Sequence, residues 1–294
     1  FRRSRGLGDV YKRQAGSLEV PDHITLWGLR LEICQHFDQY ANVRPSRLLP
    51  GIQSPLKNIG PAELDWVIVR ENTEGEYSGA GGRVHPKLPQ EVGIDVSVFT
   101  RDGIARVMRY AFELALTRPK KQLTLVTKSN AQRHGMVLWD EVFEKLKHDY
   151  PGITTDRMLV DAITTRMVLQ PQSLDTIVAT NLHADILSDL AAALSGSLGI
   201  GPTANINPER TFPSMFEPIH GSAFDLVGKD LANPLGAFWS CVMMLEHLQE
   251  KKGASLLMSA IEEVCQEGRH LPKDLGGNSC TGEVTTAVCA ALKK

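Results

Sequence analysis

The chain has 294 residues, of which 42% are hydrophobic and 22% are charged, and its formal net charge is −2. This ordinary composition excludes long disorder and small disulfide-rich scaffolds, and the lack of a basic excess argues against nucleic-acid binding. No apolar run reaches the roughly 18–20 residues of a membrane-spanning helix, so neither a membrane segment nor a membrane partner is expected. Five cysteines without a C-x-x-C pair predict free thiols and a reducing, cytoplasmic setting.

The first 14 residues, FRRSRGLGDVYKRQ, differ from the rest because they hold five basic residues, one acid and little apolar pattern. We interpret residues 1–14 as foreign sequence and leave them out of the fold argument.

Predicted strands and helices alternate from Val20 onward, which indicates an α/β architecture. Short apolar runs predict buried strands at residues 66–69, 123–126 and 176–179. Apolar residues at helical spacing predict helices over residues 101–117, around 142–146, from about 184 and over 256–264. The length predicts about two domains.

Residues 199–213 are rich in Pro, Gly and Asn, so we expect a crossing between domains or a functional loop there. They include the dinucleotide-type pattern Gly199-Ile-Gly201-Pro-Thr-Ala204. A Rossmann phosphate loop needs a strand before this pattern and a helix after it, whereas here a predicted helix precedes it and Pro202 lies inside it. We therefore expect no Rossmann fold.

Two carboxylates follow the predicted strand at 176–179. Asp185 and Asp189 are four residues apart on a predicted helix, which puts them on one face with Cβ atoms about 5–6 Å apart. Ligands of α/β proteins bind at the carboxyl ends of strands, and Mg²⁺ would compensate two close carboxylates. The alternative is an acidic first turn that interacts with the helix dipole. His183 is a further candidate ligand, or a structural residue.

Polar residues also follow the other two predicted strands. Arg70 offers bidentate recognition of a carboxylate, and Tyr77 could deliver a proton, although a polar surface loop is the alternative. Lys128 could serve as a general base beside a metal or an arginine, although a solvated lysine is the alternative.

Residues 217–225, Glu-Pro-Ile-His-Gly-Ser-Ala-Phe-Asp, form a predicted loop rich in small residues, and Asn233 follows it. The backbone of such a loop can approach a nucleotide closely. Asp225 could accept hydrogen bonds from both ribose hydroxyls and repel a 2′-phosphate.

Together these segments resemble the metal-dependent β-decarboxylating dehydrogenases of 2-hydroxy acids, which include the isocitrate, isopropylmalate and tartrate/D-malate enzymes. The resemblance covers roughly residues 15–292 and is strongest for the tartrate/D-malate branch. Four motifs carry it: PDHITLWG at 21–28, RENTEGEYS at 70–78, VTKSNAQRH at 126–134 and FEPIHGS at 216–222.

The resemblance implies a two-domain α/β fold that is not a Rossmann fold. A large cofactor-binding domain would comprise residues 15–39 and 196–294, and a small central dimerisation and metal domain would comprise residues 40–195. Members of the family begin with further strands and helices of the large domain, about two units of ~30 residues. We therefore expect a truncated chain that is poorly stable and weakly active or inactive.

The resemblance also implies a homodimer that uses NAD and Mg²⁺ or Mn²⁺ to decarboxylate D-malate or tartrate oxidatively. Lys128 would deprotonate the 2-hydroxyl, Tyr77 would protonate the enolate, and Arg44 and Arg70 would hold the departing carboxylate. The metal would be held by Asp161, Asp185 and Asp189, with Asp161 and Lys128 contributed by the other subunit. The adenosine half of NAD would be bound by Glu217, His220, Gly221, Ser222, Ala223, Asp225 and Asn233. The alternatives are an isopropylmalate or isocitrate dehydrogenase and a non-catalytic regulatory paralogue.

The chain departs from the family pattern at several positions. Cys34 stands where the family usually has an arginine that shares the carboxylate clamp, and Arg30, one helical turn earlier, is the candidate substitute. His183 and Ala184 replace Phe and Gly before Asp185, and Phe224 replaces a proline of the cofactor loop.

Overall fold

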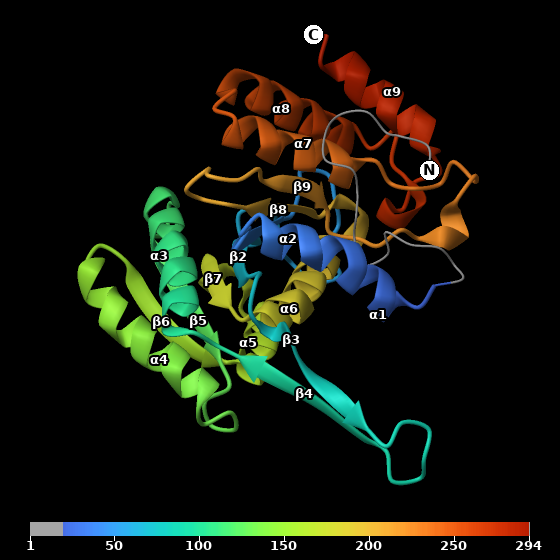
Figure 1. Ribbon diagram of the computed structural model, residues 1–294. Helices are drawn as coiled ribbons and strands as arrows, with labels where there is room; N and C mark the ends of the chain where they lie inside the picture. The colour runs from blue at the N-terminus through green and yellow to red at the C-terminus, as the bar shows by residue number, and fades with distance from the viewer. Residues whose placement is uncertain (1–19, 294) are drawn as a thin grey trace.

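The computed structural model describes residues 20–293. Its strands are β1 (Ala41–Arg47), β2 (Asp65–Glu71), β3 (Gly75–Val84), β4 (Val92–Val98), β5 (Gln122–Thr127), β6 (Thr154–Leu159), β7 (Thr176–Ala179), β8 (Pro202–Ile206) and β9 (Met215–Pro218). Seven of them form one sheet in the order β6-β5-β7-β2-β1-β8-β9. β3 and β4 form a separate antiparallel ribbon that extends away from the body of the molecule (Figure 1).

The α-helices are α1 (Asp22–Thr25), α2 (Glu32–His36), α3 (Arg101–Thr117), α4 (Gly135–Leu146), α5 (Val160–Leu169), α6 (Asn181–Leu194), α7 (Leu235–His247), α8 (Lys251–Glu267) and α9 (Thr281–Ala291). A π-helical segment, η1 (Leu26–Leu31), joins α1 to α2. Figure 1 shows α7, α8 and α9 together beside β8 and β9, with α3 and α4 on the opposite flank.

Helices cover both faces of the central strands. On β2, Trp66 and Ile68 pack in the core cluster that includes α6 and α8, whereas Val69 packs with α3 and α4. On β7, Ile177 packs in the cluster with α6 and α8, and Val178 packs with α3 and α4. A strand that is buried on both faces has an unbroken apolar run rather than an alternating one, which is why these strands could be predicted.

The predicted strands at 66–69, 123–126 and 176–179 lie within β2, β5 and β7, so those predictions are confirmed. The helix predicted over 101–117 has these bounds as α3, and the Thr100 side chain caps it by accepting a hydrogen bond from the N–H of Gly103. The helix predicted from about residue 184 begins at Asn181, because Thr180 caps it by accepting from the N–H of His183.

Residues 199–213 were predicted to be a crossing between domains or a functional loop, and a loop is wrong for residues 202–206, where β8 lies buried between β1 and β9. Proline lacks an N–H donor and is tolerated at the first residue of a strand, which is the place of Pro202 in β8. The glycine pattern therefore leads into a strand rather than a helix, and no Rossmann loop forms there.

One sheet contains strands from both predicted domains, since β1 lies within residues 40–195 and its neighbour β8 within 196–294. The division into these two domains therefore stays a prediction. The interpretation of residues 1–14 as foreign sequence concerns residues outside the described part of the chain. None of the helices between residues 20 and 293 is long and apolar enough to span a membrane.

Candidate functional site

A row of polar side chains crosses the sheet beneath α6. Asn42 of β1 lies opposite Arg70 of β2 on one side and opposite Asn205 of β8 on the other. Because side chains alternate along a strand, Arg44 points to the same face as Asn42. This row is buried, so each of its polar groups requires a partner.

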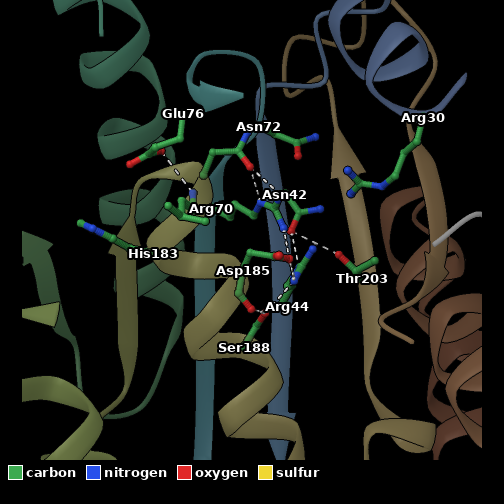
Figure 2. Close-up of polar contacts among 12 residues, drawn as sticks. Arg30, Asn42, Arg44, Arg70, Asn72, Glu76, His183, Asp185, Ser188 and Thr203 are labelled. Carbon is green, nitrogen blue, oxygen red and sulfur yellow. Dashed lines mark hydrogen bonds and ion pairs between the residues drawn. The ribbon is translucent and has the colours of Figure 1, made fainter. Parts of the chain in front are cut away.

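Asp185 of α6 holds two of the predicted substrate-binding residues together (Figure 2). Its Oδ1 accepts a hydrogen bond from Nη1 of Arg44 at 3.1 Å and from Nη1 of Arg70 at 2.5 Å. Arg44 also donates to Oγ of Ser188 at 2.6 Å, and Nε of Arg70 donates to Oδ1 of Asn181 at 2.8 Å. The structure thus brings Arg44, Arg70 and Asp185 into one buried cluster.

The cluster is crowded with positive charge. Burial and the neighbouring Arg70 lower the pKa of Arg44, whereas Asp185 acts in the opposite direction. Guanidinium groups stay protonated in proteins, so this crowding is relieved by anions rather than by loss of a proton. The site is therefore suited to bind a carboxylate.

Arg30 of η1 reaches the same polar row from the other side. Its Nε donates to Oε1 of Glu217 at 3.1 Å, and its Nη2 donates to Oδ1 of Asn205 at 3.2 Å. Glu217 was predicted to bind the cofactor, but it is fully buried on β9 as the partner of Arg30. The carboxylate of Glu217 also accepts from Nδ2 of Asn205 at 3.1 Å.

Asn205 is the meeting point of this half of the site. Its Oδ1 accepts hydrogen bonds from Arg30, from Nδ2 of Asn42 at 2.7 Å and from Nδ2 of Asn72 at 3.0 Å. Sγ of Cys34 lies 3.8 Å from the same oxygen. Burial raises the pKa of the Cys34 thiol. Cys34 is therefore neutral and supplies none of the charge that an arginine at this position would supply.

Tyr77 lies on β3 beside Arg70, whose Cζ is 5.5 Å from the centroid of the tyrosine ring. The turn before it is organised by Glu71, whose carboxylate accepts the N–H of Thr73 and of Glu74, each at 2.9 Å. Burial raises the pKa of Glu71 to about 7 despite these hydrogen bonds. Glu71 was not singled out from the sequence, although it adjoins Arg70 at the end of the same apolar run.

Lys128 and Asp161 form an ion pair with each other, and 64% of the Asp161 side chain is exposed. The hydrogen bond from Lys128 lowers the pKa of Asp161. Within residues 20–293, no three Asp, Glu, His or Cys side chains gather as a metal site, so Asp161 does not join Asp185 and Asp189 in one chain. In Figure 2 the ring of His183 points away from Asp185, which argues against a shared role with that carboxylate.

A separate cavity of about 610 Å³ lies beside the predicted cofactor loop. The predicted residues that line it are His220, Gly221, Ala223 and Asn233. Two residues that had not been singled out, Lys273 and Asp274, line it as well. Ser222 and Asp225 belong to the same loop, and Asp225 is exposed.

Asp274 fixes one wall of this cavity. It accepts a hydrogen bond from Nδ2 of Asn233 at 2.9 Å and another from Oγ of Ser197. Ala223 has a φ of 42°, a left-handed conformation that is uncommon for a residue with a side chain. Gly276-Gly277 signals a turn at 273–277, but nothing in the sequence links this turn to Asn233, because their contact spans about forty residues.

Comparisons with known proteins agree with this picture. The model of the isocitrate/isopropylmalate dehydrogenase family matches residues 15–290. A probable tartrate dehydrogenase/decarboxylase from Agrobacterium vitis is 67% identical over 96% of this chain and 79% of its own length. The decarboxylating D-malate dehydrogenase of Escherichia coli K12 is 50% identical over 93% of this chain and 77% of its own length.

Among solved structures, isocitrate dehydrogenase from Methylococcus capsulatus superposes with a TM-score of 0.84 at 35% identity. The superposition covers 95% of this chain and 78% of that one.

Proposed function

Because the chain belongs to the isocitrate/isopropylmalate dehydrogenase family, we propose that it oxidatively decarboxylates a small 2-hydroxy acid, D-malate or tartrate. Its α/β fold is that of an isocitrate dehydrogenase, as expected from the resemblance. The observation that carries the proposal is the buried cluster of Arg44, Arg70 and Asp185. The two arginines form an anion site, and Asp185 also belongs to the carboxylate pair on α6.

Arg44 and Arg70 hold the substrate carboxylate that leaves as CO₂. Both guanidinium groups are almost fully buried, and charge-assisted hydrogen bonds are strongest away from water. Oxidation of the neighbouring hydroxyl gives a 3-oxo acid, whose carboxylate is lost most easily when its orientation is fixed. The two arginines provide that orientation.

The donor set on α6 fits a divalent cation. Asp185 and Asp189 lie one helical turn apart and offer carboxylate oxygens, the ligand type that Mg²⁺ and Mn²⁺ prefer. Asp161 of a second subunit completes the set in this proposal. A cation bound there supplies Lewis-acid polarisation of the substrate oxygen that becomes a carbonyl.

Two residues move protons. Nζ of Lys128, from the second subunit, takes the proton of the 2-hydroxyl as a hydride leaves for the cofactor. The hydroxyl of Tyr77 then donates a proton to the carbon that lost CO₂. The stacking of Arg70 on the Tyr77 ring fixes this hydroxyl relative to the carboxylate clamp.

The cavity beside the loop at 217–225 binds the adenosine half of NAD in this proposal. His220, Gly221, Ala223 and Asn233 line it, while Ser222 and Asp225 complete the loop. Asp225 favours NAD over NADP, since its carboxylate would repel a 2′-phosphate. The burial of Glu217 beside Arg30 leaves that residue a structural role at the edge of the cofactor site.

Within one chain, the pair formed by Lys128 and Asp161 lies apart from the arginine cluster. A homodimer accounts for this separation, because the second subunit would bring its own pair to the cluster. The ribbon of β3 and β4 supports it, because five of its aliphatic side chains are 40–50% exposed: Val84, Val92, Ile94, Val96 and Val98. Contiguous exposed apolar residues of this kind mark interaction surfaces. We also propose a cytoplasmic setting, supported by five cysteines that form no disulfide.

The experiment is a substrate panel on the purified protein. NADH formation is followed with D-malate, tartrate, isopropylmalate and isocitrate, with Mn²⁺ and then with a chelator. We expect weak turnover of D-malate or tartrate that the chelator abolishes and that NADP does not support. Lys128→Met is expected to remove it, whereas the exposed Lys145→Met serves as a matched control.

Two results would redirect the proposal. Faster turnover of isopropylmalate or isocitrate would assign a different branch of the family. Binding of a 2-hydroxy acid without turnover would favour a regulatory paralogue.

A further inference from the structure

Arg30 is the third buried guanidinium of the polar row, and the proposed mechanism does not use it. It is 5% exposed and projects from η1 toward the residues around Asn42 and Arg44 (Figure 2). Its position in a π-helical segment is informative, because single π-turns occur frequently at functional sites.

The hydrogen-bonding capacity of Arg30 is only partly used. A guanidinium has five N–H donors, and Arg30 directs one to Glu217 and one to Asn205. Its Nη1 makes no hydrogen bond to any residue between 20 and 293. Nη1 is not among the fully buried atoms that lack a partner, so this side of Arg30 faces accessible space and is suited to an acceptor from outside the protein.

The contact between Arg30 and Asn205 is also easily exchanged. Oδ1 of Asn205 has two lone pairs, yet it receives Asn42, Asn72 and Arg30, with the Arg30 contact the longest at 3.2 Å. A carboxylate that entered the row would take over the Arg30 donor and leave Asn205 with two well-placed partners.

We propose that Arg30 is a third substrate-binding guanidinium, which holds the same carboxylate as Arg44 and Arg70. A continuous path of contacts joins them, since Nε of Arg44 donates to Oδ1 of Asn42 at 2.8 Å and Asn42 donates to the Asn205 oxygen that Arg30 contacts. This inference rests on the proposed function and deepens it.

The charges of the site indicate the substrate class. If Asp185 and Asp189 balance a divalent cation, and Lys128 and Asp161 of the proposed second subunit balance each other, Glu217 is the carboxylate that remains beside the guanidinium groups of Arg30, Arg44 and Arg70. The excess of positive charge matches a dianionic 2-hydroxy acid. A 2-hydroxy monocarboxylate lacks the carboxylate that these arginines share.

Position 34 offers a way to test the assignment with the chain's own geometry. Cys34 is buried one helical turn after Arg30, and its Sγ lies 3.8 Å from the same Asn205 oxygen. An arginine at position 34 can therefore reach the place that the Arg30 guanidinium occupies. Because an arginine there could also pair with Glu217, the informative result is recovery of KM for D-malate and not of Tm alone.

The experiment compares the wild type with Arg30→Leu, Arg30→Lys and the double variant Arg30→Leu/Cys34→Arg. We expect Arg30→Leu to raise KM for D-malate by about tenfold or more with little change in kcat, because binding is lost equally in ground and transition states. Arg30→Lys keeps a charge beside Glu217 and should fold normally, with a smaller rise in KM. In the double variant, the logarithm of KM should return at least halfway from the Arg30→Leu value to the wild-type value.

A binding readout that does not need turnover accompanies the kinetics. We expect Arg30→Leu to weaken the thermal stabilisation of the protein by D-malate but not by D-lactate, a monocarboxylate of the same type. Unchanged KM in both Arg30 variants would overturn the inference while the proposed function stands. Equal losses for D-malate and D-lactate, or recovery of Tm without recovery of KM in the double variant, would make Arg30 structural. A wild type that neither binds nor oxidises any 2-hydroxy acid would instead overturn the proposed function, and the role of Arg30 with it.

Discussion

Replacing Asp185 by asparagine removes the charge that holds Arg44 and Arg70 together at the centre of the fold. In the metal-free protein both Nη1 atoms share one oxygen of Asp185, and all three side chains are less than 10% exposed. Breaking a buried ion pair by removing one partner costs about 3–5 kcal/mol, and two charge-assisted hydrogen bonds at about 1.5–3 kcal/mol each give a similar sum. Asparagine keeps a neutral acceptor, so we expect a loss of about 3 kcal/mol, at the lower end of that range.

The assay is urea unfolding at pH 7.5 with a chelator present, supported by a thermal melt. For a chain of this size, a loss of about 3 kcal/mol lowers Tm by roughly 6–12 °C. Ser188→Ala is the matched control, because it removes one neutral acceptor from Arg44 and should cost about 1 kcal/mol. A loss below about 1 kcal/mol for Asp185→Asn, as for an exposed ion pair, would refute the idea that this carboxylate organises the free protein.

Three further predictions test other parts of the structure. Burial raises the pKa of Glu71 from 4.5 to about 7, so the folded state holds the proton more tightly, and stability should fall as the pH rises between these values. The midpoint of urea unfolding should therefore depend less on pH in Glu71→Gln than in the wild type across that window, and equal slopes would contradict the assignment. Asp274→Ala should raise KM for NAD several-fold and leave KM for D-malate unchanged, because Asp274 lines the cavity that we propose for the cofactor; a rise in both would argue against a separate cofactor site. Gly51→Ala should cost about 2–4 kcal/mol in urea unfolding, since φ is +81° and a Cβ would lie 2.4 Å from the carbonyl oxygen of Cys265. Gly152→Ala, where a Cβ meets nothing within 4 Å, should change stability by less than about 0.5 kcal/mol, and similar losses for both glycine variants would refute the steric argument.

The strands that could be predicted are those that two helical layers cover. β2, β5 and β7 have unbroken apolar runs because their side chains are buried on both faces. β1 and β8 were not predicted, although both are also buried. Their polar residues, among them Asn42, Arg44 and Asn205, face each other inside the molecule, and a single sequence does not distinguish such residues from those of a loop.

The candidate site likewise has one part that could be predicted from the sequence and one part that could not. Asp185 and Asp189 could be paired from spacing alone, because a helix makes neighbours of residues four apart. The contact of Asp185 with Arg44 spans 141 residues of sequence, and only the family resemblance had placed these two residues in one site. Glu217 shows the limit of such transfer, since its motif suggested a cofactor ligand, whereas its side chain is buried beside Arg30.

The position of β8 determines which contacts Arg30 can make. Asn205 reaches the polar row because β8 pairs with β1 in a register that sets Asn205 opposite Asn42, and this brings its oxygen between Asn42 and Arg30. If residues 202–206 were the loop expected from their sequence, Arg30 would have Glu217 as a partner but no connection to Arg44. The buried strand therefore joins the ion pair of Arg30 and Glu217 to a continuous row of polar contacts that reaches Arg44. For the same reason, a substitution that shifts β8 should affect the Arg30 contact before it affects the contact between Arg70 and Asp185, which depends on β2 and α6 alone.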